Sequence, residues 1–233
     1  MGADDYRRYL AQEWQLFVDH PERAESAATI SRHILPIRRV LDVGCGAGQE
    51  LLPYLHGALC VALDLAEEAC PVARQRLNQV NKNARLSFGR ARAEALPIRK
   101  GQFDLVICRL VLPYTNIREV LAEAAGVLRP GGGFSVQVHS IWYYLRELRR
   151  AVARRDRRSI RHALRVLGTG ARLHLLGQQP VGGPLETFIT RAMLRRMSKG
   201  VGLEFVLKVR NGNPYAPHFL FRRDSVFVSS PPE

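Results

Sequence analysis

The sequence predicts an α/β fold built on a largely parallel sheet. Residues 40–43 form an apolar run rich in β-branched side chains, which ends in a glycine-rich turn, and apolar side chains at helical spacing begin again at residue 51. Further apolar runs that read as strands follow at residues 60–64, 85–89 and 103–108. With 233 residues, 46% of them hydrophobic, the chain is long enough to bury the core of one such domain with some elaboration.

Two helices are expected before the first strand. Residues 4–18 carry apolar and aromatic side chains close to helical spacing, and Pro21 opens a second helical run that extends to residue 35. In a bare α/β domain such helices cover one face of the sheet.

The glycine-rich turn after the first strand indicates a ligand site. Gly44, Gly46 and Gly48 alternate, and glycines at such a turn let the backbone approach a ligand closely. Dinucleotide-binding turns space their second and third glycines three residues apart, which differs from this pattern. Asp42 precedes the turn and would repel a pyrophosphate, whereas it suits a cationic ligand. Cys45 lies within the turn and is expected to contact the same ligand.

Residues 42–48 resemble motif I of the class I S-adenosylmethionine-dependent methyltransferases. A second marker of that family, the sequence Leu-Arg-Pro-Gly-Gly before a strand, stands at residues 128–132, so the resemblance covers about residues 38–139. It implies S-adenosylmethionine as the cofactor, whose sulfonium and ammonium groups account for Asp42. It also implies a Rossmann-like α/β fold: a seven-stranded, mostly parallel sheet with an antiparallel last strand and helices on both faces.

The resemblance gives the N-terminal helices a second interpretation. In these enzymes such helices often close over the cofactor and line the acceptor pocket. Tyr6, Tyr9 and Trp14 are therefore candidates for acceptor contacts, and packing in the core is the alternative.

Asp64 ends the second strand, sixteen residues after Gly48. In α/β nucleotide folds a carboxylate at about this distance accepts from the ribose hydroxyls. The alternative is that Asp64 caps a helix beginning near residue 66.

The adenine end of the site departs from the family pattern. The segment from Ala93 resembles the Gly-Asp-Ala-Glu-x-Leu-Pro segment of the small-molecule branch, but Arg92 replaces the aspartate that accepts from the adenine amino group. A guanidinium has no acceptor to offer. We therefore expect Leu65 and Leu96 to pack on the adenine, helped by the backbone at Ala93 and by Glu94.

The methyl-transfer end is expected where the fourth strand ends, at Cys108 and Arg109, because ligands sit at the carboxyl ends of parallel strands. His139, at the end of the fifth strand, is the first candidate for a general base, with Tyr143 and Tyr114 as orienting groups. A capping or packing role is the alternative for His139.

A basic insert follows the fifth strand. Residues 146–165 contain nine arginines against Glu147 and Asp156, within a chain of net charge +14. The apolar spacing predicts two amphipathic helices with a break near residues 154–159. An anionic membrane surface, a nucleic-acid backbone and plain solvent are all compatible with this face. The nucleic-acid interpretation is less favoured, because no RNA-binding module accompanies the insert.

A helix over residues 190–198 and strands over 204–209 and 219–228 are expected to complete one methyltransferase domain. We divide it into N-terminal cap helices (residues 1–36), a cofactor-binding core (37–139), the basic insert (140–180) and the C-terminal helix and strands (181–233). The four cysteines lack the paired spacing of a metal site and are interpreted as core residues. The sequence gives no basis for a particular oligomeric state.

The expected function is methyl transfer to a small acceptor, lipophilic or quinone-like, as in the ubiquinone/menaquinone methylase-like (methyltransferase type 11) group. Base-amino methyltransferases place an Asn/Asp-Pro-Pro-aromatic motif after the fourth strand, and this chain has none there. The alternatives are an RNA- or protein-directed methyltransferase and a non-catalytic S-adenosylmethionine-binding module. The absence of a long apolar run predicts a cytoplasmic protein, with peripheral membrane attachment through the insert as a further hypothesis.

Overall fold

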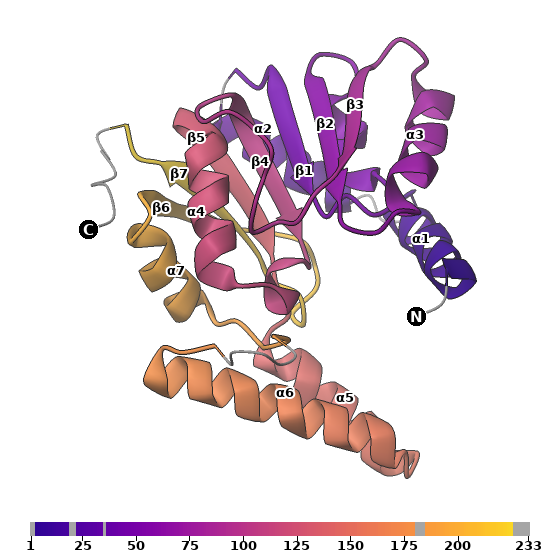
Figure 1. Cartoon of the computed structure of the whole chain (residues 1–233), viewed down its shortest axis with the longest axis vertical. Coiled ribbons are helices and arrows are strands. Elements are labelled where there is room, and N and C mark those ends of the chain that lie inside the picture. Colours follow the sequence, from indigo (N-terminus) through magenta and orange to yellow (C-terminus); the bar gives the residue numbers. More distant parts are fainter. Residues whose placement is uncertain (1–2, 19–21, 35, 180–184, 226–233) are drawn as a thin grey trace.

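The computed structural model describes residues 3–18, 22–34, 36–179 and 185–225. Its centre is a seven-stranded sheet in the order β3-β2-β1-β4-β5-β7-β6 (Figure 1). The strands are β1 (Arg39–Val43), β2 (Leu59–Asp64), β3 (Arg85–Arg90), β4 (Phe103–Arg109), β5 (Leu128–Gln137), β6 (Leu203–Val209) and β7 (His218–Arg223). Strands β1 to β5 pair in parallel, and β7 runs antiparallel to both of its neighbours. The mostly parallel sheet with an antiparallel last strand is thus confirmed.

Helices cover both faces of this sheet. The helices of the described residues are α1 (Ala3–Val18), α2 (Glu22–His33), α3 (Ala69–Val80), α4 (Ile117–Val127), α5 (Ile141–Ala153), α6 (Arg157–Leu176) and α7 (Arg191–Lys199), with two short 3-10 helices, η1 (Gln49–Tyr54) and η2 (Leu112–Tyr114). Of these, α5 and α6 do not cover the sheet. Helices α4 and α7 share one buried apolar cluster with the sheet, whereas α2, α3 and η1 belong to the cluster on the opposite face.

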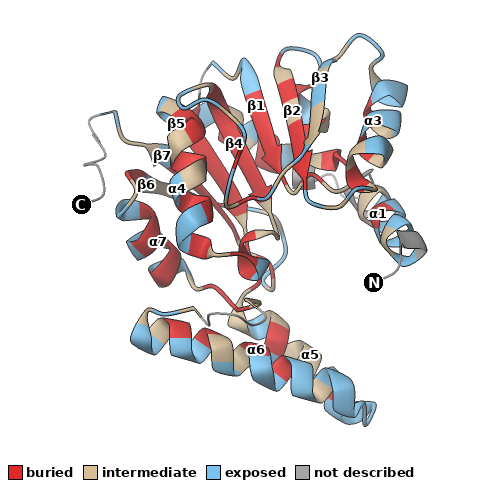
Figure 2. Cartoon of the chain, in the orientation of Figure 1, coloured by how far each residue is buried: buried red, intermediate tan, exposed pale blue. Residues whose placement is uncertain are grey.

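Alternating side chains of the central strands build these two clusters. In β1, Val40 joins the cluster under α2 and α3, and Leu41 joins the cluster under α4 and α7. In β4, Leu105 and Val106 divide in the same way, and all four side chains are fully buried. The continuous apolar runs of the sequence are therefore strands buried on both faces (Figure 2).

The segment after the glycine turn differs from expectation. The sequence predicted a helix from residue 51, but residues 49–54 form the 3-10 helix η1, which contains Pro53. Proline lacks the N–H that an α-helix needs and clashes with the preceding turn, so the helix is not extended. The chain then returns to the sheet at β2.

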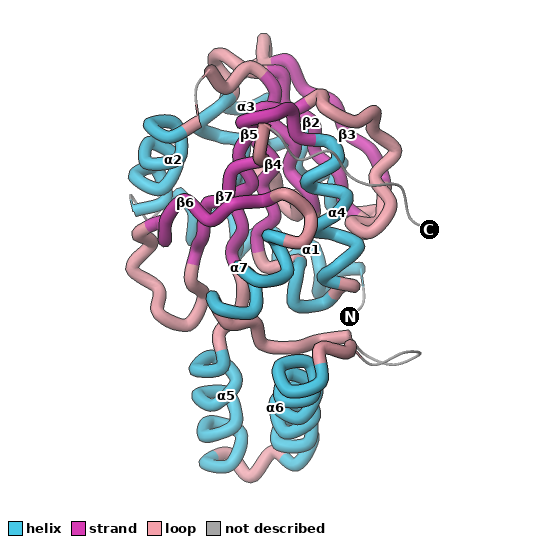
Figure 3. The backbone as a smooth tube through the Cα atoms, turned by 90° about the vertical axis from the view of Figure 1, so that its left-hand side faces the viewer, coloured by secondary structure: helices cyan, strands magenta, loops and turns pink. Residues whose placement is uncertain are grey.

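The basic insert forms two helices, α5 and α6, which project together from the sheet domain as a hairpin (Figures 1 and 3). The break between them falls at residues 154–156, where Asp156 accepts from the backbone N–H groups of Arg158 and Ser159 and so caps α6. A small apolar cluster of Tyr144, Val166 and Phe188 joins the hairpin to the chain that follows it. Helix α6 continues to Leu176 and ends at Gly177, which has a left-handed backbone conformation.

The C-terminal segments agree with the sequence where the structure describes them. Helix α7 and strand β6 match their predicted ranges within a residue or two. Strand β7 ends at Arg223, and the last part of its predicted range, residues 226–228, lies outside the described residues, as do Pro21 and residue 35. Across the described residues, none of the helices is both long and apolar enough to pass through a bilayer.

Candidate functional site

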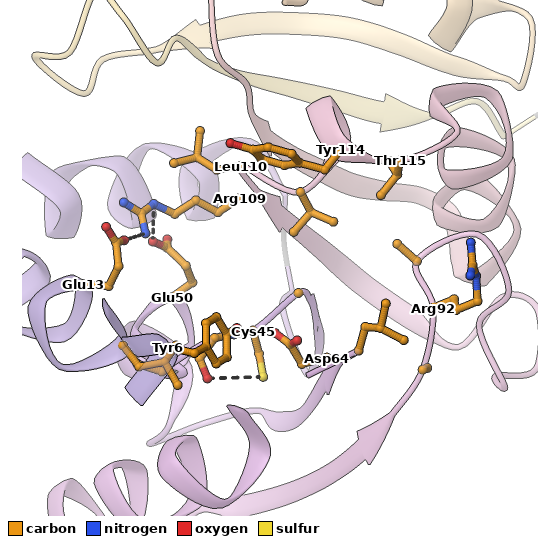
Figure 4. A pocket seen from close by; sticks show the side chains of 18 of the residues that line it. Tyr6, Glu13, Cys45, Glu50, Asp64, Arg92, Arg109, Leu110, Tyr114 and Thr115 are labelled. Carbon is orange, nitrogen blue, oxygen red and sulfur yellow. Dashed lines mark hydrogen bonds and ion pairs between the residues drawn. The ribbon is translucent and has the colours of Figure 1, made fainter. Parts of the chain in front are cut away.

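A cavity of about 460 Å³ opens at the carboxyl ends of β1, β2 and β4. This is the edge of the sheet where the strand order reverses, between β1 and β4, and where open α/β sheets bind ligands. Residues from α1, the glycine turn and the segments after β2, β3 and β4 surround the cavity (Figure 4). Its lining is Tyr6, Tyr9, Leu10, Glu13, Gly44, Cys45, Gly46, Ala47, Gln49, Glu50, Asp64, Leu65, Ala91, Arg92, Ala93, Glu94, Arg109, Leu110, Val111, Tyr114, Thr115 and Leu185.

The glycine turn forms the floor of this cavity. Gly44, Gly46 and Gly48 have φ angles of 71°, 51° and 80°, in the left-handed region that favours glycine. A Cβ atom at Gly44 would lie 2.1 Å from Cγ2 of Val111, which is too close for any side chain unless Val111 moves. Gly44 and Gly46 line the cavity, whereas Gly48 faces the core side chains of α3.

Asp42 lies just before the turn and is almost completely buried, with 1% of its surface exposed. Neither carboxylate oxygen has a hydrogen-bond partner among the described residues. Burial, followed by the charges of Glu50 and Asp64, raises the pKa of Asp42 well above its usual value. Asp42 is not among the residues that line the cavity, so its predicted contact with the cofactor stays a prediction.

Asp64 lines the cavity at the end of β2. Its Oδ2 accepts from the N–H of Gly46 at 2.9 Å, and its Oδ1 accepts from the N–H of Ala66 at 2.9 Å. A carboxylate offers about four acceptor positions, so about two remain for a ligand's hydroxyl groups. The capping alternative is wrong, because the next helix begins only at Ala69 and its N-cap residue is Glu68.

The residues predicted to lie near the adenine differ in their exposure and in their contacts. Leu65 is 54% exposed at the cavity, and Ala93 is buried in its wall. The Glu94 carboxylate already accepts from the N–H of Asn116 at 3.2 Å and lies 3.7 Å from Nε of Arg92. The Arg92 side chain is 64% exposed, so it reaches solvent at the rim. Leu96 packs in the core and is absent from the lining.

Arg109 forms ion pairs with two glutamates, an arrangement that the sequence did not predict. Its Nη1 lies 2.6 Å from Oε2 of Glu13, and its Nε lies 3.2 Å from Oε1 of Glu50 and donates to Oε1 of Gln137 at 3.0 Å. Burial by itself would lower the pKa of Arg109, but the charges of Glu50 and Glu13 outweigh it and raise that pKa. Of these three residues the sequence singled out only Arg109, because residues 13, 50 and 109 come close to one another only in the folded chain.

The residue after Arg109 is strained. Leu110 has a φ angle of 58°, which is rare for a side chain of this size. Its N–H donates to the carbonyl of Gln137 at 2.9 Å, which helps hold this conformation. Leu110 also lines the cavity, so the strained position lies at the candidate site.

Aromatic side chains supply another part of the wall. Tyr6 and Tyr9 of α1 stack with ring centroids 6.0 Å apart, and both line the cavity. Their predicted role as acceptor contacts stays a prediction, and Tyr6 lies beside Cys45 and Asp64 (Figure 4). Trp14 instead packs against the core with the guanidinium of Arg76 over its ring, 5.2 Å from the centroid.

The three predicted catalytic residues are close together, but only Tyr114 lines the cavity. His139 lies behind it, 8% exposed, with its ring edge-on to Tyr114 at 6.3 Å and stacked on Tyr143 at 4.0 Å. Burial, and then the charges of Arg109 and Arg146, lowers the pKa of His139 to about 4. Cys108 is likewise set back, fully buried in the core beside the site.

Comparison with known proteins places this site in context. Residues 41–136 match the model of a family described as Methyltransferase domain. The chain is 33% identical over 106 residues to the uncharacterized methyltransferase YcgJ of Bacillus subtilis, covering 43% of this chain and 40% of that protein. It is 32% identical over 171 residues to the ubiquinone biosynthesis O-methyltransferase of Thiobacillus denitrificans, covering 72% of this chain and 65% of that protein. The chain thus spans less than two thirds of the length of these relatives.

Solved structures agree on the fold. Magnesium protoporphyrin IX methyltransferase from Synechocystis PCC 6803, with bound S-adenosylhomocysteine, superposes with a TM-score of 0.66 at 16% identity, covering 94% of each chain. The crystal structure of YcgJ gives a TM-score of 0.57 at 20% identity, covering 80% of this chain and 70% of that one. At such identities the likeness establishes the fold alone.

Proposed function

We propose that this chain, which carries a class I S-adenosylmethionine-dependent methyltransferase domain, transfers a methyl group to the hydroxyl of a small, lipophilic acceptor of the phenol or quinol kind. The observation that carries the proposal is that one cavity is lined on one side by the glycine turn and Asp64 and on another by aromatic side chains. One wall holds Gly44, Gly46 and Asp64, and the other holds Tyr9 and Tyr114. A cofactor and its acceptor can therefore meet in one space.

The residues present fit the cofactor. Asp64 would accept from the ribose hydroxyls, Leu65 and Ala93 would pack on the adenine, and Gly44 and Gly46 would bring the backbone against the rest of the molecule. S-adenosylmethionine, when bound, supplies a methyl group already activated by a positively charged sulfur. The protein then mainly has to hold the acceptor in line with that group and exclude water.

The charges of the cavity favour a neutral acceptor. Arg109 carries the most deeply placed positive charge of the lining, and Glu13 and Glu50 compensate it. An anionic acceptor would therefore find no unmatched cation at this end. The rings of Tyr9 and Tyr114 suit a flat aromatic acceptor instead. Ubiquinone biosynthesis O-methyltransferases among the relatives are consistent with this class of acceptor.

Calorimetric titration with S-adenosylmethionine and S-adenosylhomocysteine tests the first half of the proposal, and we expect micromolar binding of both. The second half is tested with methyl-labelled S-adenosylmethionine and three probes: a catechol carrying a short prenyl chain, the same catechol carrying a carboxylate instead, and a mixed RNA. Transfer to the prenyl catechol supports the proposal. Transfer only to RNA would replace it, and binding without transfer to any probe would favour a non-catalytic module.

We further propose that the α5–α6 hairpin attaches the protein to an anionic membrane surface, where a lipophilic acceptor is found. The hairpin projects from the sheet domain and exposes large apolar side chains among its arginines, Trp142 at 64% and Leu164 at 53%. Basic side chains near an anionic bilayer contribute about 1 kcal/mol each, and aromatic groups settle at its interface. Nucleic acid is the less favoured partner.

Co-sedimentation with anionic and neutral vesicles tests the attachment. Charge reversal of Arg154, Arg155, Arg157 and Arg158 should abolish binding to anionic vesicles and leave cofactor affinity intact. A matched control reverses four exposed charges elsewhere, at Arg99, Lys100, Arg195 and Arg196, and should retain vesicle binding. Equal loss in both variants, or binding to RNA but not to vesicles, would contradict the proposal.

A further inference from the structure

We propose that the α5–α6 hairpin sets the position of one wall of the cofactor cavity through a short linking segment, residues 185–189. In this arrangement Glu186 and Phe188 are positioning residues, which act on the cavity through their neighbours in the chain. The inference rests on the proposed function in one respect, because the wall concerned includes Tyr114, at which the acceptor is proposed to bind.

The linking segment contacts the sheet domain at the cofactor cavity. Leu185 lines that cavity. Thr187 is fully buried, and its N–H donates to the carbonyl of Pro113 at 2.9 Å. Pro113 precedes Tyr114 in η2, and Tyr114 lines the same cavity. The positions of Leu185 and Tyr114 therefore depend on where the linking segment lies.

The carboxylate of Glu186 attaches the linking segment to both helices of the hairpin. Its Oε1 accepts from the hydroxyl of Tyr144 in α5 at 3.1 Å, and its Oε2 lies 3.3 Å from Nε2 of His162 in α6. Tyr144 is 1% exposed, so loss of this bond would leave a buried hydroxyl without that partner, which is costly. The bond to Tyr144 therefore fixes Glu186 against α5.

Phe188 packs tightly against the hairpin. Its ring stacks on that of His174 in α6, with centroids 4.7 Å apart, and it shares an apolar cluster with Tyr144 and Val166. A Cβ atom at Gly170 of α6 would lie 2.3 Å from two atoms of the Phe188 ring. The ring and α6 therefore cannot both keep their positions if residue 170 carries a side chain.

These contacts connect the hairpin to the cavity, although none of the described residues of α5 or α6 lines that cavity. Close-packed interiors transmit a displacement and do not absorb it. A shift of α6 against Phe188 should therefore move Thr187, and with it the η2 turn that carries Tyr114. The hairpin thereby determines how closely an acceptor fits against this wall.

Two matched glycine variants test the connection without any acceptor or cofactor. Replacement of Tyr114 by 3-fluorotyrosine gives a ¹⁹F NMR resonance that reports the surroundings of this ring in the unliganded protein. Gly170→Ala should move the resonance by more than its line width. Gly168→Ala, in the same helix, should leave it in place, because a Cβ there meets no atom within 4 Å. An unmoved resonance in Gly170→Ala, or equal movement in both variants, would overturn the proposal.

A second pair of variants decides the question if Gly170→Ala does not fold. Glu186→Ala removes the acceptor of the Tyr144 hydroxyl and should move the same resonance. Glu186→Gln keeps an oxygen for that hydroxyl but removes the charge, and it should leave the resonance in place.

This comparison separates movement of the linking segment from loss of a charge. Burial, and then the charge of Glu186, raises the pKa of Tyr114, so the charge also acts on that ring directly. Equal movement in Glu186→Ala and Glu186→Gln would show a charge effect alone and would overturn the proposal. An unmoved resonance in Glu186→Ala would do the same.

Turnover of the prenyl catechol tests the consequence for the acceptor. Gly170→Ala and Glu186→Ala should each raise KM for the catechol by about tenfold, equivalent to about 1.4 kcal/mol, and leave the affinity for S-adenosylmethionine unchanged. Gly168→Ala and Glu186→Gln should keep the KM of the unaltered protein. An unchanged KM in the first two variants would overturn the effect on the acceptor. Absence of transfer in the unaltered protein would instead count against the proposed function, and the fluorine resonance alone would then decide the connection.

Discussion

The carboxylate of Asp64 accepts a hydrogen bond from the backbone N–H of Gly46, with 2.9 Å between Oδ2 and the nitrogen. This bond ties the end of β2 to the glycine turn that follows β1, so the two segments are held at a fixed separation. We expect the same side chain to accept from the ligand as well.

Replacement of Asp64 by alanine should therefore weaken cofactor binding by at least about tenfold, because a charged acceptor contributes roughly 1.5–3 kcal/mol. Titration calorimetry with S-adenosylhomocysteine measures the effect. Glu67→Ala, which removes a nearby exposed carboxylate outside the cavity, is the control and should bind normally. Unchanged affinity in Asp64→Ala would remove this residue from the site.

Gly44→Ala should destabilise the fold and disable the site together. The φ angle of 71° strains any other residue, and the new Cβ would lie 2.1 Å from Cγ2 of Val111. Strain of this kind costs about 1–3 kcal/mol before the clash is counted, so the melting temperature should fall by roughly 5 °C or more.

Gly126→Ala is the matched control, measured by the same thermal unfolding. Gly126 lies in α4, its φ angle is not positive, and a Cβ there meets no atom within 4 Å. Alanine in a helix is favoured over glycine by about 0.5–1 kcal/mol, so this variant should melt slightly higher. Similar behaviour of the two variants would show that the conformation of Gly44 is not the reason for its glycine.

Asp64 and Gly44 also show how much of the structure the sequence could predict. The glycine turn and the first strands could be predicted because each depends on a local pattern, a glycine spacing or an apolar run. The seven-stranded sheet was implied by the family resemblance, and the ligand contact of Asp64 stays a prediction. The short length of η1 could be predicted only in part, because Pro53 disfavours a long α-helix but is compatible with a 3-10 turn.

The sequence did not predict the contacts between segments that are far apart in the chain. Arg109 meets Glu13 and Glu50 because α1 folds across the end of the sheet, and no periodicity in residues 4–18 singles out one glutamate. The contact from Tyr144 to Glu186 joins residues 42 positions apart. Likewise, the sequence placed His139 at the end of β5 but could not indicate that Tyr114 would lie between it and the cavity. Its catalytic role, like that of Tyr143, stays a prediction.

Asp42→Asn should raise the melting temperature at pH 7. Because burial raises the pKa of Asp42, the folded state binds more protons than the unfolded state above pH 4, and stability falls as the pH rises through that range. Asparagine does not ionise, so we expect the variant to melt at a higher temperature than the unaltered protein at pH 7, by an amount that shrinks toward pH 4. Thermal unfolding across that range measures it.

Asp104→Asn is the control for a buried aspartate that has partners. Its Oδ2 accepts from the N–H groups of Arg38 and Arg39, and its Oδ1 lies 2.6 Å from Nε of Arg129. Loss of this charge should lower the melting temperature. A fall of the same size in Asp42→Asn would mean that the Asp42 carboxylate is stabilising, and the interpretation of its unpartnered oxygens would be wrong.

His218→Gln should make the protein more resistant to acid. Burial, and then the charge of Arg109, lowers the pKa of His218 from 6.5 to about 4, and its Nε2 lies 2.7 Å from Oγ of Ser135. The unfolded state therefore binds more protons between these pH values, so stability is present above pH 6.5 and is lost as the pH falls toward 4. Each such histidine, His139 included, contributes about 2–3 kcal/mol to that loss. Glutamine keeps a polar group within reach of Ser135 but does not titrate, so urea unfolding should show a smaller difference between pH 7 and pH 4.5 in the variant. An equal difference in both proteins would mean that His218 is already protonated, or exposed, in the folded state.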